Sequence, residues 1–208
     1  MQRSCSLVSE QNVVGRTHRW QRLAEAASLA LALHAEQRRK GTEVPYVAHL
    51  LSVAALVLEY GGNEEQAIAG LLHDVIEDVG AEQEVVIASR FGARVAAIVR
   101  GCTDADTIPK PPWRVRKEAY LHHLEHVDTD VLLVSGCDKL HNARAIVGDL
   151  RTDGPAVFTR FNGGQAGTLW YYAAVAEVIG RRLPGALAVD LAETVQHMQR
   201  VAASNVPI

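Results

Sequence analysis

A polar patch interrupts the apolar segment AIAGLLHDVIEDV, which ends at Gly80. Helical spacing places His73 above Glu77 and Asp74 above Asp78, so these four side chains form one patch. Its three carboxylates lie at the negative end of the helix dipole and repel one another, which packing alone does not explain. An imidazole beside a carboxylate suits a divalent metal that carries out hydrolysis, although two ligands alone do not hold such an ion. The alternative is that Glu77 and Asp78 point to water and Asp74 makes a surface ion pair.

Two other segments supply further candidate ligands. His49 stands at the start of a helical pattern, where a side chain can point inward, and the alternative is a helix-capping or solvent-facing histidine. Asp138 follows an uncharged apolar run, VLLVSGC, which predicts that its carboxylate is carried into the interior and needs a cationic partner. That partner is either a metal or a basic side chain such as Arg144. Helical spacing places Asn142 on the face of Asp138 and puts two neighbours off that face, Lys139 and His141.

Helical periodicity dominates the whole sequence, and alternating strand-like runs are scarce. The pattern predicts a single-domain all-α fold of roughly eight to ten helices. Asn63 is placed to cap the helix that carries the polar patch. The stretch TDADTIPKPPW predicts a stiff connection, and the segment from Asp153 to Gly164 predicts a loop. The helices are expected at Trp20–Gln37, Ala48–Tyr60, 63–80, Glu82–Arg90, 93–102, Arg114–His126, Asp130–Leu150, Ala166–Arg182 and Gly185–Ala203.

The composition is that of an ordinary soluble globular domain, with 208 residues, 48% of them hydrophobic and 22% charged. The net charge of −3 disfavours binding of a long nucleic acid, but it allows a local basic pocket for a small phosphorylated ligand. The sequence predicts no membrane helix and no secretory signal. Three cysteines without close spacing suit a reducing compartment, so we expect the cytoplasm. Residues 1–16 are expected to be loosely ordered, and the oligomeric state is not predicted.

Three segments in a fixed order, PYVAH, LLHDVIED and DKLHNAR, resemble the HD metal-dependent phosphohydrolase superfamily. Within it, RRKGTEVPYVAH resembles the RK-G-PYI-H segment of the RelA/SpoT-type hydrolase domain, and LLHDVIED resembles its HD-x-x-ED motif. CDKLHNAR is similar to its AD-R/K-LHN-R motif. The resemblance spans about residues 27–151, within a hydrolase domain expected over 17–208 whose closing helices cover 163–203. Two departures from the family pattern, His49-Leu50 and Gly136-Cys137, remove no ligand and bear on substrate choice.

The resemblance implies hydrolysis of the 3′-pyrophosphate of the alarmone (p)ppGpp to GDP or GTP and pyrophosphate, with a divalent metal, usually Mn²⁺. By position, the metal ligands of the family match His49, His73, Asp74 and Asp138. Glu77 and Asp78 match the acidic pair that activates water, with Glu77 acting on the water and Asp78 hydrogen-bonded to hold its orientation. The segment after Leu150 is too short for the synthetase domain of bifunctional relatives, so a stand-alone hydrolase without synthetase activity is expected.

Several residues are candidates for binding the guanine nucleotide. By resemblance, the basic pair near the guanosine matches Arg39 and Lys40, and Asn142 lies beside the nucleotide. Arg116 and Lys117 are a second candidate source of positive charge for the pyrophosphate, with a solvated helix face as the alternative. Tyr171 and Tyr172 are candidates for stacking on a base or are core aromatics. A surface role is expected for three other histidines, His122, His123 and His126.

Other functions fit the same residues. An HD phosphohydrolase with this metal set could act on the 2′-phosphate of NADPH or on a (deoxy)nucleoside monophosphate, because the metal centre itself does not select the substrate. A nucleotide-binding regulator without catalysis is a second alternative, but it has no need of Glu77 and Asp78. A structural helical-bundle module is the third, and the absence of bound metal would favour it.

Overall fold

The computed structural model describes residues 20–104 and 109–204, and the regular elements in these ranges are helices, which confirms the predicted all-α class. The expectation for residues 1–16 lies outside them. The helices are α2 (Gln21–Leu33), α3 (Val47–Glu59), α4 (Glu64–Leu72), α5 (Val75–Asp78), α6 (Gln83–Phe91), α7 (Ala93–Cys102), α8 (Trp113–Leu124), α9 (Thr129–Asp153), the 3-10 helix η1 (Gly154–Arg160), α10 (Gly164–Arg182) and α11 (Ala186–Ser204).

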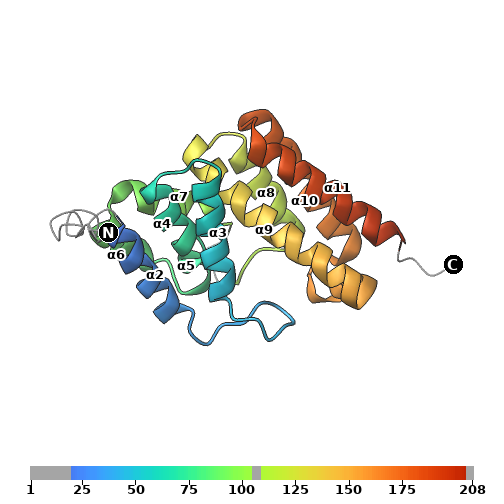
Figure 1. The fold of residues 1–208 in the computed structure, drawn as a ribbon, viewed down its shortest axis with the longest axis horizontal. Coiled ribbons are helices and arrows are strands. Elements are labelled where there is room, and N and C mark those ends of the chain that lie inside the picture. The colour runs from blue at the N-terminus through green and yellow to red at the C-terminus, as the bar shows by residue number, and fades with distance from the viewer. Residues whose placement is uncertain (1–19, 105–108, 205–208) are drawn as a thin grey trace, which may run out of the picture.

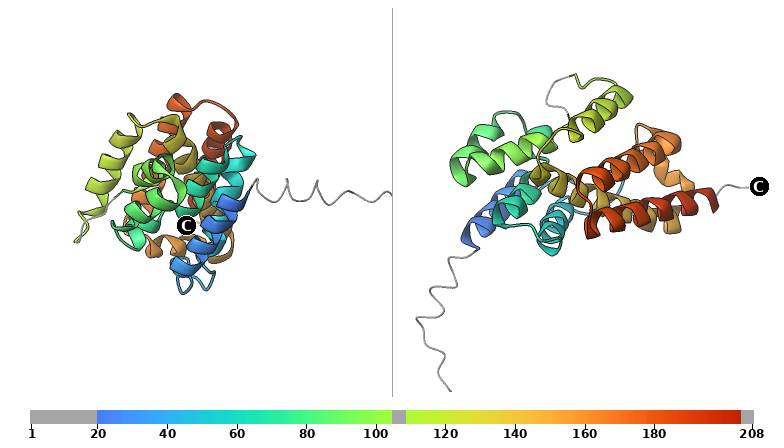
Figure 2. Two further views of the ribbon diagram at one scale, coloured as in Figure 1. Left: turned by 90° about the vertical axis from the view of Figure 1, so that its left-hand side faces the viewer. Right: turned by 90° about the horizontal axis from the view of Figure 1, so that it is seen from above.

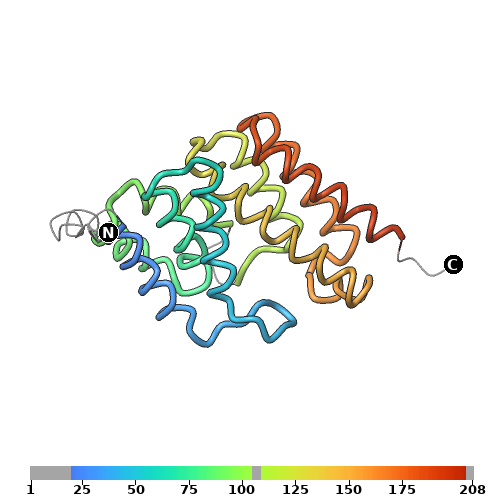
Figure 3. Tube along the Cα trace, in the orientation of Figure 1, coloured from blue at the N-terminus to red at the C-terminus, as the bar shows by residue number. Residues whose placement is uncertain are grey.

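The long helix α9 forms the centre of the molecule (Figure 1). It packs against α3, α4 and α7 on one side and against α10, α11 and η1 on the other. Seen from above, α8 and α11 lie on opposite edges (Figure 2). The loop between α2 and α3 extends beneath α9 toward η1 (Figure 3). Because α9 separates the two halves, polar side chains on it can meet groups from several other helices.

Close packing against α9 explains one departure from the family pattern. A Cβ atom added at Gly136 would lie 2.8 Å from Cδ2 of Leu187, so the glycine allows α11 to approach. Cys137 is fully buried in the hydrophobic core, as is Leu50 on α3. These residues therefore serve packing, and they do not line the cleft beside His49 and Asn142.

The predicted cap of α4 is confirmed, but its predicted continuation to Gly80 is wrong. The Asn63 side chain accepts a hydrogen bond from the Gln66 amide, and the Gln66 side chain accepts one from the Asn63 amide. The helix stops after Leu72 because the chain turns at His73 and Asp74 before α5 begins. Nδ1 of His73 lies 2.8 Å from the carbonyl oxygen of Gly70, the acceptor that the next backbone amide would use in a continuous helix.

The other predicted boundaries differ by a few residues. The first helix ends at Leu33 rather than Gln37, and the chain then turns into a bridge between Arg38 and Pro45. The segment from Asp153 to Gly164, expected to be a loop, contains η1. The stiff connection between α7 and α8 falls partly outside the described residues.

Candidate active site

Four candidate metal ligands from three helical regions meet beside α9. His49 comes from α3, His73 and Asp74 from the turn between α4 and α5, and Asp138 from α9. Nε2 of His49 lies 3.2 Å from Oδ1 of Asp138, and Nε2 of His73 lies 2.9 Å from Oδ2 of Asp74. One ligand atom each from His49, His73 and Asp74 fall within 4.8 Å of one another, so this group could hold a metal ion.

The orientation of His73 shows what this cluster needs. Nδ1 of His73 donates to the Gly70 carbonyl, which leaves Nε2 as the nitrogen that faces the carboxylates. Nε2 is buried and forms no well-aligned hydrogen bond, although Oδ2 of Asp74 is only 2.9 Å away. Nε2 of His73 and Oδ2 of Asp74 face the same space, which a cation bound to both atoms would fill. The donor set therefore fits a divalent metal with mixed nitrogen and oxygen ligands.

The electrostatics of the cluster also favour a shared positive charge. Burial by itself lowers the pKa of His73, but the carboxylates of Asp74 and Asp138 raise this pKa well above its usual value. Burial likewise opposes ionisation of Asp74, yet His73 holds the pKa of Asp74 below its ordinary range. The hydroxyl of Tyr46 donates to Asp74 over 2.5 Å and stays protonated, since burial and this carboxylate raise the pKa of Tyr46.

Asp138 is fixed by its neighbours on α9. Nδ2 of Asn142 donates to Oδ1 of Asp138 over 2.5 Å, and the ammonium group of Lys139 donates to Oδ2. Burial opposes ionisation, but Lys139 and then the two histidines hold the pKa of Asp138 well below its ordinary value. The prediction that Lys139 lies off this face is wrong, because a long side chain can turn back to its neighbour. Arg144, the alternative partner, bonds Asp190 instead.

His141 also contacts the site, contrary to the prediction from helical spacing. Its Nδ1 lies 2.8 Å from Nδ1 of His49, and the rings are 4.9 Å apart. Burial, and then His49, lower the pKa of His141 to about 4, so it is neutral and can accept a hydrogen bond. If His49 Nε2 faces a metal, His49 Nδ1 is the donor of this bond. His141 thus fixes both the tautomer and the ring orientation of His49.

We expect His141→Ala to weaken metal affinity about 10–100-fold, because His49 loses the group that orients it. Titration of the metal-free chain with Mn²⁺ measures this change. His141→Gln should recover much of the affinity, since its side-chain oxygen can accept the same bond. His126→Ala is the matched control, because His126 is exposed and contacts the carbonyl and ring of His122, away from the ligand cluster. Equal affinity in His141→Ala and the control would contradict an orienting role.

The acidic pair Glu77 and Asp78 lies on α5, directly after the ligand turn. Nζ of Lys110 donates to Oε1 of Glu77 over 2.7 Å. Burial and then Asp104 raise the pKa of Glu77, against the opposing effect of Lys110. Burial and then Asp74 raise the pKa of Asp78 as well. Both carboxyls are therefore more basic than ordinary ones, which suits acceptance of a proton.

A chain of hydrogen bonds that sequence reasoning missed holds Asp78. Oδ2 of Asp78 accepts from Nε2 of Gln37 over 2.8 Å, and Oε1 of Gln37 accepts from Nδ1 of His34 over 2.5 Å. His34 is fully buried. Asp78 is thus oriented by α2 and its following turn. The three-residue spacing between His34 and Gln37 is the feature of the sequence that could have indicated this contact. It was overlooked because the helix was expected to continue to Gln37.

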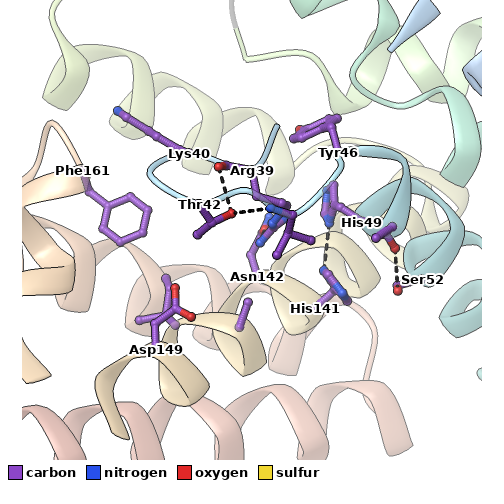
Figure 4. A pocket seen from close by; sticks show the side chains of 14 residues that line it. Arg39, Lys40, Thr42, Tyr46, His49, Ser52, His141, Asn142, Asp149 and Phe161 are labelled. Carbon is purple, nitrogen blue, oxygen red and sulfur yellow. Dashed lines mark hydrogen bonds between the residues drawn. The ribbon is translucent and has the colours of Figure 1, made fainter. Parts of the chain in front are cut away.

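A cleft of 410 Å³ opens beside the cluster and shares His49 with it (Figure 4). The predicted residues Arg39, Lys40 and Asn142 line it, and Phe161 and Asp149 stand at its far end. An Arg39 Nη2 donates to Oδ1 of Asn142 over 2.9 Å. Since Asn142 in turn holds Asp138, the basic side chain in the cleft is connected to a candidate metal ligand.

The loop that carries Arg39 and Lys40 rests on Arg160 of η1. Gly41 has a φ of +73°, and a Cβ added there would lie 2.6 Å from Cδ of Arg160. Arg160 is itself held by Asp149 at 2.8 Å and by Asp153 at 2.5 Å. The loop therefore requires glycine at this position for both its backbone conformation and its contact with Arg160.

We expect Gly41→Ala to lower the free energy of unfolding by about 1–2 kcal/mol, the usual strain of a left-handed residue with a side chain. Urea denaturation measures the change. Gly180→Ala on α10 is the control, because a Cβ there meets nothing within 4 Å and its φ is not positive. Gly180→Ala should leave stability unchanged or raised. Equal effects of the two substitutions would show that the loop conformation is not constrained as described.

Neither interpretation of Arg116 and Lys117 fits the structure in full. Arg116 donates to Asp104 over 2.6 Å and Lys117 over 2.5 Å, and both side chains are largely buried. They are thus neither a solvated face nor unpaired charges. Lys117 does line a second cavity of 200 Å³ and stands 4.8 Å from the centre of the Tyr171 ring. Tyr171 is buried, and its hydroxyl has no hydrogen-bond partner within the described chain.

The two cavities are neighbours. The second is lined by Trp113, Lys117, Lys139, Asn142, Phe161, Thr168, Tyr171 and Tyr172 and therefore shares Asn142 and Phe161 with the cleft.

Three expected surface histidines, His122, His123 and His126, are exposed, and the metal-capable group found in the described ranges does not include them. Over those ranges no helix is long and apolar enough to cross a membrane.

Comparison with known proteins agrees with this geometry. A family model described as "HD domain" matches residues 26–169, and the chain belongs to this family. The chain is 39% identical over 125 residues to the guanosine-3′,5′-bis(diphosphate) 3′-pyrophosphohydrolase MESH1 of Xenopus tropicalis, covering 59% of this chain and 68% of the relative. Human MESH1 is 36% identical over 125 residues, with 59% and 68% covered.

A solved structure gives the same result over more of the chain. It is described as a metazoan ortholog of SpoT that hydrolyses ppGpp, and it matches with a TM-score of 0.68 and 26% identity, covering 95% of this chain and 99% of that one. Within the HD domain family, this chain therefore belongs with the guanosine-3′,5′-bis(diphosphate) 3′-pyrophosphohydrolases. The resemblance to the RelA/SpoT-type hydrolase domain is confirmed.

Proposed function

We propose that this protein hydrolyses the 3′-pyrophosphate of (p)ppGpp, giving GDP or GTP and pyrophosphate. The observation that carries the proposal is the shared wall of the cleft and the cluster. His49 belongs to both, and Asn142 bonds Arg39 in the cleft and Asp138 in the cluster. A guanosine nucleotide in the cleft would thus lie next to the ligand cluster, and we propose that its 3′ side faces the cluster. The relatives named above support the choice of nucleotide.

The candidate ligands are His49, His73, Asp74 and Asp138, and we propose Mn²⁺ as the resident ion. Such an ion, when bound, makes water more acidic and polarises a phosphoryl oxygen. The carboxylates of Asp74 and Asp138 are ligands that suit this ion. A reducing, cytoplasmic location is also proposed, because the two cysteines in the described residues are free thiols.

Hydrolysis also needs a proton acceptor and positive charge that binds the nucleotide, and side chains of this protein supply both. The carboxylate of Glu77 accepts the proton of the attacking water, and its raised pKa favours that acceptance. Asp78, held by Gln37, keeps the acidic pair in place. The guanidinium of Arg39 and the ammonium of Lys40 attract the anionic nucleotide into the cleft. Tyr171 contributes to the neighbouring cavity a hydroxyl that has no partner within the described residues, and Lys117 contributes an ammonium group that already pairs with Asp104; a phosphate of the same substrate can lie there.

A comparison of substrates tests the proposal. The purified chain with Mn²⁺ is assayed with ppGpp, NADPH and a deoxynucleoside monophosphate, and kcat/KM is expected to be highest for ppGpp. The same panel with Arg39→Ala shows whether the cleft carries the preference, since the loss should be larger for ppGpp than for the other two. A higher kcat/KM for NADPH would overturn the choice of substrate. Tight ppGpp binding without turnover would favour a regulator. Absence of synthetase activity stays a prediction.

A further inference from the structure

A separate groove, of 480 Å³, lies between α9 and α11, on a different face of α9 from the cleft and from the cavity lined by Tyr171. The two helices run in the same direction here, since Arg144 bonds Asp190 and Arg151 bonds His197. The groove shares no lining residue with the cleft. It therefore has to be explained separately from the candidate active site.

Positive charge gathers in this groove. Arg144, Arg151 and Arg200 line it, against the single lining carboxylate of Glu193. Nη2 of Arg151 lies 2.7 Å from Nε2 of His197, so the guanidinium donates to an imidazole lone pair instead of a carboxylate. Over residues 20–104 and 109–204, no carboxylate pairs with Arg151 or Arg200.

Several surface arginines outside the groove are arranged differently. Arg94 pairs with both Glu65 and Asp130, and Arg181 pairs with both Glu125 and Glu177. Clustered guanidinium groups repel one another unless an anion lies between them. The groove thus holds two arginines, Arg151 and Arg200, for which the described residues supply no carboxylate partner, beside Arg144, which bonds Asp190.

Gly148 adds an independent observation. It lies inside the 25-residue helix α9 and lines the groove. A Cβ atom there would meet nothing within 4 Å, and its φ is not positive. Glycine inside a helix is less favourable than alanine by about 1 kcal/mol. Glycine at this position leaves the floor of the groove without a side chain.

We infer that this groove binds a compact polyphosphate anion, of the class of inorganic pyrophosphate or the phosphate chain of a nucleotide. Guanidinium groups match phosphate oxygens with paired hydrogen bonds. The distance along α9 from Arg144 to Arg151 is about 10 Å, from the helical rise, which suits two or three linked phosphates better than an extended peptide. This site does not depend on the proposed function.

Binding of inorganic pyrophosphate to the full metal-loaded chain tests the inference. Calorimetry on Arg200→Ala and Arg151→Ala is compared with Arg90→Ala, an exposed arginine that stacks on Phe91 of α6 at the other end of the molecule (Figure 1). Wild type and Arg90→Ala should show a binding event that is weakened about tenfold in each groove variant, as expected for one charge-assisted hydrogen-bonding group. In NMR spectra, pyrophosphate should shift the imidazole signals of His197, identified by their loss in His197→Gln.

Hydrolysis of (p)ppGpp should remain at the wild-type rate in the groove variants at low pyrophosphate concentration, because none of these residues lines the cleft. Unchanged affinity in both variants, together with unshifted His197 signals, would overturn the inference. Arginine-dependent binding of an oligoglutamate peptide without binding of pyrophosphate would also overturn it, and would assign the groove to an acidic polypeptide.

Discussion

Glu77→Gln is expected to lower kcat for (p)ppGpp about 10²–10⁴-fold while metal content stays unchanged. The amide keeps the size of the side chain but cannot accept a proton from water. Glu77 is no part of the candidate ligand set and accepts a hydrogen bond from Lys110, so the cluster of histidines and aspartates stays intact. Steady-state turnover and elemental analysis of the same preparation measure the two quantities.

A matched substitution, Glu177→Gln, controls for the change from carboxylate to amide, because Glu177 is largely exposed in a helical pair with Arg181. It should leave kcat unchanged.

The pH profile gives a second readout of Glu77. Since its pKa is raised, wild-type activity should fall, as the pH decreases, at a higher pH than an ordinary glutamate predicts. Lys110→Ala should move this fall to still higher pH. A Glu77→Gln enzyme with near wild-type turnover would contradict a proton-accepting role.

Asp138→Ala is expected to release the metal and to lower the free energy of unfolding by about 3–5 kcal/mol. The metal loses a ligand whose Oδ1 lies 3.2 Å from His49 Nε2 and 3.7 Å from His73 Nε2. Stability falls because Lys139, whose ammonium is largely buried beside Asp138, is left without its partner. Elemental analysis and urea denaturation measure the two effects.

Asp138→Asn separates them, because the amide keeps the shape and an acceptor oxygen for Lys139 but removes the negative charge. We expect it to lose most of its metal with a smaller loss of stability. Asp128→Asn at the start of the same helix is the control, since Asp128 is exposed and remote from the cluster. Full metal occupancy in both Asp138 variants would exclude Asp138 as a ligand.

The helical architecture was readable from the sequence because it depends on local rules. Apolar periodicity located the helices to within a few residues, and Asn63 caps α4 as its side chain predicts. The break at His73 and Asp74 was not readable. It depends on the bond from His73 to Gly70, a competition between side chain and backbone that periodicity does not show.

The candidate site was predicted where one residue type stands out and missed where a contact is made across helices. Asp138 was noticed because an apolar run carries it inward. Helical periodicity shows neither the bond from His34 to Gln37 nor the contact between His141 and His49. Arg116 was considered for the substrate, but it neutralises Asp104, which the sequence gives no reason to pair with it. Such partners are decided by the packing of distant segments.

The most direct test of the proposed reaction is ³¹P NMR of ppGpp incubated with the Mn²⁺-loaded chain and quenched at successive times with a chelator. We expect GDP and intact inorganic pyrophosphate to appear in equal amounts, in step with the loss of ppGpp. Release of orthophosphate, or persistence of ppGpp alongside hydrolysis of NADPH, would contradict the removal of a 3′-pyrophosphate by this site.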